Sequence, residues 1–175
     1  MIEIAQIQPS PSLRAGNVFP QGLINLWTPT VSFETPGDLV VGYGNRAGSY
    51  FKFGSRVELF FSIVTSSFSY LVGASGDLII TGLPYPSAPG LFVDASNSAP
   101  NSLYGTLSWG GITKATYTQI SPYVASSSNR ASSSIIHFMA SGSAVAPVDV
   151  VVANVPSGSD VVLEGSLVYF TDVGV

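Results

Sequence analysis

Bulky apolar residues alternate with other residues along several short stretches of the chain. In the clearest stretch, residues 56–64, the alternate positions are Val57, Leu59, Phe61 and Ile63. Because successive side chains of a β-strand point to opposite faces of its sheet, these positions share one face. The opposite face begins at Arg56 but also carries Phe60. We therefore expect a strand with one face in the core and the other only partly exposed to water.

The stretch near the C-terminal end alternates in the same way but has apolar side chains on both faces. One face comprises Val161, Leu163, Leu167 and Tyr169; the other comprises Val162, Glu164, Val168 and Phe170. A strand of this kind is covered on both sides. We expect one face to lie in the core and the other to face a second subunit.

Short runs of this type fill the chain from Trp27 onward, separated by glycine, proline, serine or asparagine. No stretch keeps the period of about 3.6 residues that marks an amphipathic helix. This pattern predicts an all-β domain in which two antiparallel sheets pack as a sandwich of jelly-roll type, with the strand order left open. The predicted strands cover Thr30–Phe33, Asp38–Tyr43, Ser49–Phe53, Arg56–Thr65, Phe68–Val72, Leu78–Thr81, Leu91–Asp94, Leu103–Trp109, Thr116–Tyr123, Ser134–Ala140, Val148–Ala153 and Val161–Phe170.

The N-terminal segment has a different composition, because five of its residues are proline or glycine: Pro9, Pro11, Gly16, Pro20 and Gly22. Proline lacks a backbone donor and interrupts both helices and central strands. We expect residues 1–25 to form an extended arm and residues 26–175 to form a single domain. Apolar side chains along the segment offer anchors on a neighbouring molecule, and a frayed terminus is the alternative.

Charged residues are scarce and scattered. They make up 9% of the chain, against about 25% in ordinary soluble domains. Broad uncharged surfaces usually mark contacts with other proteins, so we expect a stable homo-oligomer. The net charge is −4 and the six Lys and Arg residues form no basic stripe, so nucleic acid is not an expected partner.

The composition also argues against thiol chemistry and against membrane insertion. The chain has no cysteine, which excludes disulfides, thiolate nucleophiles and cysteine-based zinc sites. A long charge-free run, residues 59–76, is interrupted repeatedly by serine and threonine, and its apolar residues alternate. That pattern indicates strands rather than a membrane-spanning helix.

Residues that would support catalysis or metal binding are few. His137, the only histidine, lies on one strand face with Ile135 and Met139, and we expect it to be structural or to face a subunit. There is no Gly-x-Ser-x-Gly nucleophile motif, no phosphate-binding glycine motif and no Asp-rich calcium loop. A glycosidase needs two carboxylates facing each other, whereas capping of turns explains the acidic residues more simply. We therefore predict no enzyme activity, no cofactor and no metal.

Five aromatic residues, Tyr85, Tyr104, Trp109, Tyr117 and Tyr123, lie in the central part of the chain. Aromatic side chains on long loops suit stacking on a glycan or contact with a protein partner. Packing in the core or in a subunit interface is the alternative. We take these residues as the candidate partner-contacting or glycan-contacting set.

Two segments of the central region predict loops. The apolar run that begins at Asp77 stops at Gly82 and is followed by Pro84 and Pro86, which predicts a stiff, uncharged turn beside a symmetry mate or a shell. The serine-rich tract Ala125–Ser134 predicts a surface loop, facing a receptor or serving as a plain connection.

Four short patches bracket most of the predicted domain. They are Trp27–Pro29, Gly48–Val57, Gly82–Tyr85 and Gly165–Phe170. Their order and spacing resemble a domain that occurs near the ends of tail-fibre, tail-spike and head-surface proteins of tailed bacteriophages. The resemblance implies a trimeric jelly-roll module on the virion surface, with a structural or adhesive role.

The chain carries no coiled-coil heptads, shaft or collagen-like repeat ahead of the domain. This favours a trimeric capsid decoration (cement) protein on the head, with the arm or the base of the domain contacting the major capsid protein or another virion protein. The alternative is a tail-fibre tip or knob module that binds a host receptor or glycan. Both interpretations place the protein on the virion surface after synthesis in the host cytoplasm.

Overall fold

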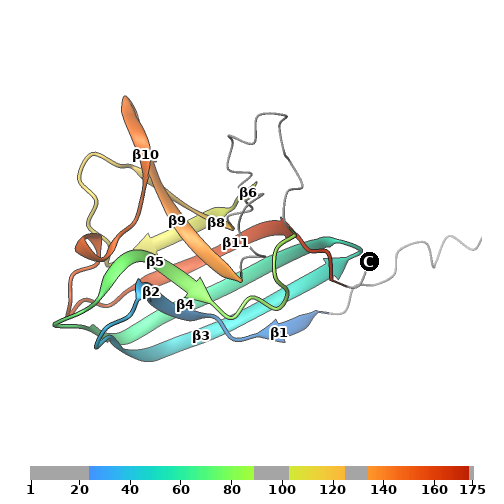
Figure 1. Ribbon diagram of the computed structural model, residues 1–175, viewed down its shortest axis with the longest axis horizontal. Coiled ribbons are helices and arrows are strands. Elements are labelled where there is room, and N and C mark those ends of the chain that lie inside the picture. The colour runs from blue at the N-terminus through green and yellow to red at the C-terminus, as the bar shows by residue number, and fades with distance from the viewer. Residues whose placement is uncertain (1–23, 89–102, 125–133, 174–175) are drawn as a thin grey trace, which may run out of the picture.

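The computed structural model describes residues 24–88, 103–124 and 134–173 (Figure 1). Residues 1–23, most of the tract Ala125–Ser134 and the predicted strand Leu91–Asp94 lie outside the described residues. No helix in the described part of the chain has the length and apolar character needed to cross a membrane.

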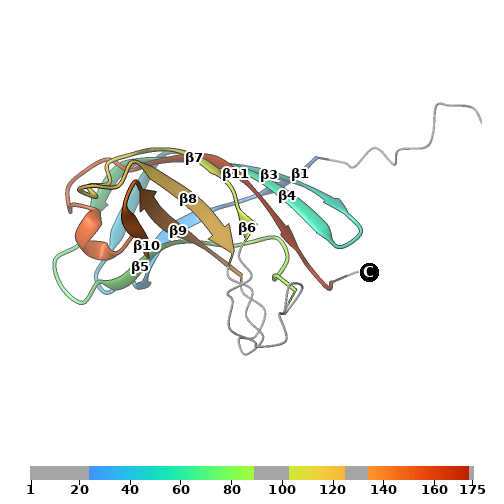
Figure 2. The same cartoon turned by 90° about the horizontal axis from the view of Figure 1, so that it is seen from above.

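The described strands form two antiparallel sheets, as predicted (Figures 1 and 2). Sheet A has five strands in the order β1-β3-β4-β11-β7, and sheet B has six, in the order β2-β5-β9-β8-β6 with β10 paired to β9. The jelly-roll assignment stays a prediction. The strands of sheet A are β1 (Asn25–Trp27), β3 (Val40–Phe53), β4 (Arg56–Ser69), β7 (Thr106–Gly110) and β11 (Val162–Phe170); those of sheet B are β2 (Thr30–Thr35), β5 (Ser75–Thr81), β6 (Leu103–Tyr104), β8 (Gln119–Val124), β9 (Ile135–Gly142) and β10 (Val145–Asp149).

The inner faces of the two sheets share one hydrophobic core. The alternation predicted for residues 56–64 is confirmed, because Val57, Leu59, Phe61 and Ile63 are at most 4% exposed while Phe60, on the other face, is 39% exposed. Burial of alternate side chains on one face is the main favourable term that holds such a sheet in place. The residues of sheet B that complete this core include Val31, Phe33, Leu78, Ile80, Ile136 and Phe138.

Two of the predicted strand breaks are wrong, and both lie in the hairpin formed by β3 and β4. The predicted strands Asp38–Tyr43 and Ser49–Phe53 are one continuous strand, β3, and two register shifts on either side of Tyr43 carry it past the residues that indicated a break. Such bulges keep a strand paired although one residue lacks a partner. The predicted strands Arg56–Thr65 and Phe68–Val72 are likewise one strand, β4, which ends at Ser69.

Three other predicted strands differ from the structure for local reasons. Leu103–Trp109 is divided at Gly105, where the chain passes from sheet B to sheet A and a Cβ atom would lie 2.0 Å from the carbonyl oxygen of Ser166. Thr116–Tyr123 loses its first residues because Thr116 has a φ of 69°, which no strand allows. Val148–Ala153 is the end of β10 followed by a turn of 3₁₀ helix, η1 (Val152–Asn154).

The four patches that carry the phage-protein resemblance contact one another. Trp27 of β1 pairs with Gly48 of β3, where a Cβ atom would lie 2.4 Å from the indole nitrogen. The rings of Tyr50 and Tyr85 meet edge to face with their centroids 5.8 Å apart. The hydroxyl of Tyr169 donates a hydrogen bond of 2.9 Å to the carbonyl oxygen of Tyr85. These residues hold the end of sheet A and the segment after β5 together, so their conspicuous spacing reflects the fold.

Candidate ligand-binding face

The outer face of sheet B carries a row of ring side chains. Tyr104 of β6 pairs with Tyr123 of β8, and Tyr123 pairs with His137 of β9. Directly paired residues of antiparallel strands place their side chains on the same face. The rings of Tyr123 and His137 stack with their centroids 5.3 Å apart, and that of Tyr104 lies tilted at 5.6 Å from Tyr123.

Burial falls along this row towards β6. His137 is 7% exposed and Tyr123 is 8% exposed, although both point away from the core between the sheets. Tyr104 is 55% exposed. The row therefore has a closed, rigid end at β9 and an open aromatic end at β6.

Acidic side chains gather at the closed end. The hydroxyl of Tyr123 donates a hydrogen bond of 2.7 Å to Asp149 Oδ1. His137 Nδ1 lies 3.5 Å from Asp77 Oδ2, and the backbone N–H of Asp77 donates a 3.4 Å hydrogen bond to Glu34 Oε2. Three strands and the end of a fourth thus bring three carboxylates and one imidazole together.

Two of these groups, Asp77 and Tyr123, have a raised pKa. Burial raises the pKa of Asp77, the negative charges of Asp149 and Glu34 raise it further, and His137 acts in the opposite direction. Burial and the hydrogen bond to Asp149 raise the pKa of the Tyr123 hydroxyl, which is therefore protonated at neutral pH. The closed end is a region of negative charge held partly away from water.

A pocket of about 360 Å³ opens beside the ring row. The amide of Gln119 donates a 3.1 Å hydrogen bond to Ser121 Oγ, so two of its polar groups already have a fixed orientation. A hollow with one aromatic wall and a few oriented polar groups is the usual form of a small-ligand site. Its lining comprises Tyr104, Gln119, Ser121, Met139, Ser141 and Pro147.

The structure brings together two of the five predicted aromatic residues, Tyr104 and Tyr123. Tyr85 packs on Tyr50 at the end of sheet A. Trp109 and Tyr117 are partly buried against the core, and the Tyr117 hydroxyl donates a 3.3 Å hydrogen bond to the carbonyl oxygen of Ala146.

The predicted turn lies outside this face. Gly82 adopts a φ of 90° where the chain leaves β5. Pro84 and Pro86 are half-buried, and two residues after Pro86 the N–H of Ala88 donates a 2.7 Å hydrogen bond to the carbonyl oxygen of Phe170.

Sequence reasoning missed the carboxylates and the polar wall of the pocket. Glu34, Asp77 and Asp149 belong to strands far apart in the chain, and strand order alone decides that they meet. The alternation of side chains along single strands indicates part of this face. Met139 shares a strand face with His137, and Ser121 shares one with Tyr123. The residues of this face that come from one strand could therefore be grouped from the sequence, but the neighbouring strands could not.

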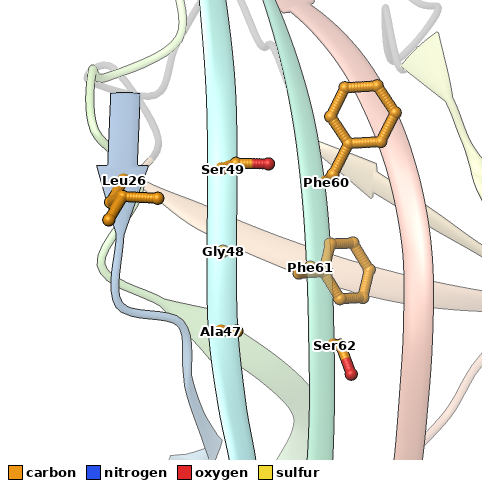
Figure 3. Close-up of a pocket in the computed structure, with 7 residues that line it drawn as sticks. All are labelled: Leu26, Ala47, Gly48, Ser49, Phe60, Phe61 and Ser62. Atoms are coloured by element: carbon orange, nitrogen blue, oxygen red, sulfur yellow. The ribbon is translucent and has the colours of Figure 1, made fainter. Parts of the chain in front are cut away.

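The outer face of sheet A has a second hollow, of about 290 Å³, with a different chemistry (Figure 3). Leu26 of β1 and Phe60 of β4 stand on either side of Gly48 and Ser49 of β3 in this view. Leu26 is 83% exposed, and no charged side chain lines the hollow. This hollow is apolar and open, in contrast to the acidic closed end of the face of sheet B.

No protein-family model and no curated protein matches the sequence. Among solved structures, the fold is similar to the crystal structure of the Dettilon tailspike protein gp208, with a TM-score of 0.53 and 18% sequence identity. The similarity covers 83% of this chain and 23% of the tailspike chain. The chain therefore spans less than a quarter of the length of that protein, and at this identity the likeness concerns the fold alone.

Proposed function

We propose that this protein is a non-enzymatic structural protein on the tail of a bacteriophage virion, and that the outer face of sheet B binds a glycan of the host surface. The pocket beside Tyr104 is the observation that carries the glycan-binding part. The likeness of fold to a tailspike protein supports the tail location. It favours the adhesive alternative over capsid decoration, for which no feature of the described residues argues specifically.

The pocket offers the contacts that sugars use. The exposed ring of Tyr104 provides an apolar face for the C–H groups of a pyranose, and the side chains of Gln119, Ser121 and Ser141 provide hydrogen-bond partners for its hydroxyls. The carboxylates of Asp77 and Asp149 stand at the closed end of the same face. Like charges repel, so a neutral sugar or an amino sugar fits this face better than a sialic acid or a uronic acid.

Binding without cleavage is the simpler chemistry for this face. Glycoside hydrolysis needs one carboxyl group as acid and another as nucleophile or base on the two sides of the scissile bond. Here Asp149 accepts a hydrogen bond from Tyr123, and Asp77 lies against His137. Neither carboxylate lines the pocket.

We further propose that the protein assembles as a homotrimer through the outer face of sheet A. Leu26, Phe53 and Phe60 are exposed on that face, and Phe51 packs against both phenylalanines. Exposed apolar side chains grouped on one sheet usually mark a protein contact. A closed cyclic assembly covers such a face on every copy and leaves sheet B turned outward.

The binding proposal is tested by competition for adsorption. Purified protein is expected to slow adsorption of its phage to host cells, and Tyr104→Ala is expected to need about tenfold more protein, a loss of about 1.4 kcal/mol in binding. Leu71→Ala serves as the control, because Leu71 is exposed and lies outside the pocket. Equal competition by both variants would refute the assignment of the pocket, and no competition by the wild-type protein at saturation would refute the adhesive role.

A further inference from the structure

Three potential metal ligands converge on the outer face of sheet B, outside the proposed glycan pocket. Glu34 comes from β2, Asp77 from β5 and His137 from β9, which are consecutive strands in the order of the sheet. One ligand atom from each residue lies within 4.8 Å of the other two. The convergence depends on strand pairing, because the residues are far apart in the sequence.

The imidazole of His137 gives an independent indication of a ligand at this place. Its Nδ1 atom is fully buried, and no described group makes a hydrogen bond with it. The nearest carboxylate oxygen, Asp77 Oδ2, is 3.5 Å away, which is long for a hydrogen bond. A buried nitrogen without a hydrogen-bond partner costs free energy, so such atoms usually bind a metal ion, a water molecule or a hydrogen-bonding group of the protein. This one points towards the carboxylate of Asp77.

The local charge also favours a cation. Among the described residues, no Lys or Arg side chain forms an ion pair with Glu34, Asp77 or Asp149. Lys114 reaches this region but donates its 2.8 Å hydrogen bond to the backbone oxygen of Asp149.

We propose that Glu34, Asp77 and His137 bind a divalent transition-metal ion, with Zn²⁺ as the best match. Imidazole nitrogen suits Zn²⁺, Ni²⁺ or Cu²⁺ and is a poor ligand for Ca²⁺ or Mg²⁺, whereas carboxylate oxygens alone would suit the latter. Ligand atoms around a tetrahedral Zn²⁺ are about 3.4 Å apart, given bonds of about 2.1 Å. Glu34 is exposed and Asp77 is half-buried, so their side chains have room to close the remaining distance.

Such an ion would join three strands of sheet B and fix the ring on which Tyr123 stacks. Its exposed side, near Glu34, leaves a coordination position for water or for an oxygen of a bound molecule. The proposal goes beyond the glycan-binding function and does not depend on it, because metal binding is measured without any sugar or host cell.

The test is a calorimetric titration of tag-free, EDTA-treated protein with ZnCl₂ at neutral pH, and with CaCl₂ in parallel. One Zn²⁺ per chain is expected to bind, to raise the melting temperature and to bind more weakly as protons compete for the ligands at lower pH. Glu34→Gln and Asp77→Asn are each expected to weaken Zn²⁺ binding at least about tenfold. Glu58→Gln is the matched control, since Glu58 lies on sheet A and pairs with Arg56.

His137→Gln provides a further check, and Co²⁺ provides a spectroscopic one. Bound Co²⁺ is expected to show the strong visible absorption of a four-coordinate site with nitrogen and oxygen ligands, and His137→Gln is expected to abolish it. Because His137 is buried, the Glu34→Gln variant decides the outcome if the histidine variant fails to fold. Absence of saturable Zn²⁺ binding by the wild-type protein, or equal binding by Glu34→Gln and Glu58→Gln, would overturn the proposal.

Discussion

Gly48→Ala tests whether the contacts between the four sequence patches defined above stabilise the fold. The added Cβ atom would lie 2.4 Å from the indole nitrogen of Trp27 and 2.7 Å from two ring carbons. The indole must therefore move, although it is 8% exposed and its Nε1 donates a 3.2 Å hydrogen bond to the carbonyl oxygen of Phe60. Glycine is required here by space, because its φ is not in the left-handed region.

The expected cost follows from two contributions. Overpacking a closed site costs about 1–3 kcal/mol, and losing the indole hydrogen bond costs about 0.5–1.5 kcal/mol. We expect Gly48→Ala to lower the free energy of unfolding by about 2–4 kcal/mol, a large part of the stability of an ordinary domain. Tryptophan emission should shift to longer wavelength as the ring of Trp27 becomes exposed.

Gly44→Ala is the matched control on the same strand. A Cβ atom there would meet only the carbonyl oxygen of Val64, at the ordinary contact distance of 3.5 Å. We expect little change or a slight gain in stability, because alanine restricts the unfolded chain. Urea unfolding followed by circular dichroism, at one fixed protein concentration, gives both values. Equal midpoints for the two variants would refute the packing argument.

Four further variants test the site, its charges and the assembly. Tyr123→Phe removes the hydrogen bond to Asp149 and should cost about 1.5–3 kcal/mol in urea unfolding; an unchanged midpoint would contradict its structural role. The pKa of Asp77 is raised above 3.8, so the folded state binds the carboxyl proton of Asp77 more tightly than the unfolded state does. The free energy of unfolding therefore falls as the pH rises from 3.8 through the pKa of Asp77 in the folded state. Asp77→Asn should therefore raise the melting temperature at pH 7 in metal-free buffer and flatten this slope, and a lower melting temperature would contradict that. The pKa shift of Asp38 has the opposite sign, because hydrogen bonds from the N–H groups of Leu71 and Val72 hold its pKa below 3.8. The contribution of this carboxylate to stability is therefore present at pH 7 and lost in acid. Asp38→Asn should lower the free energy of unfolding more at pH 7 than at pH 2. Phe60→Arg should convert the proposed trimer to a monomer in light scattering with its β-sheet circular dichroism retained, whereas an assembly of unchanged mass would argue against sheet A as the interface.

The parts of the fold that depend on local alternation were predictable from the sequence. The alternation around Leu59 sufficed to place the inner face of β4, because burial of every second side chain needs no knowledge of the partner strand. The bulge beside Tyr43 and the crossing at Gly105 were not predictable, since both depend on what lies opposite. A glycine or asparagine between apolar runs indicates a break as readily as a bulge.

The candidate site was predictable in its aromatic part and not in its charged part. Tyr104 and Tyr123 attract attention in any sequence rich in loops, because rings are the usual contacts of sugars and partners. The sequence predicts that His137 is structural or faces a subunit, since a single histidine without a neighbouring acid suggests no chemistry. The carboxylates of Asp77 and Glu34 approach it only through the pairing of β2, β5 and β9, and that register is a tertiary property.

The central claim is that the protein belongs to the tail of the virion and presents sheet B to the host. Electron microscopy of virions labelled with a gold-conjugated antibody against this chain tests the location directly. The account predicts label at the tail and none on the head. Label distributed over the head would contradict it and would favour the capsid decoration role instead.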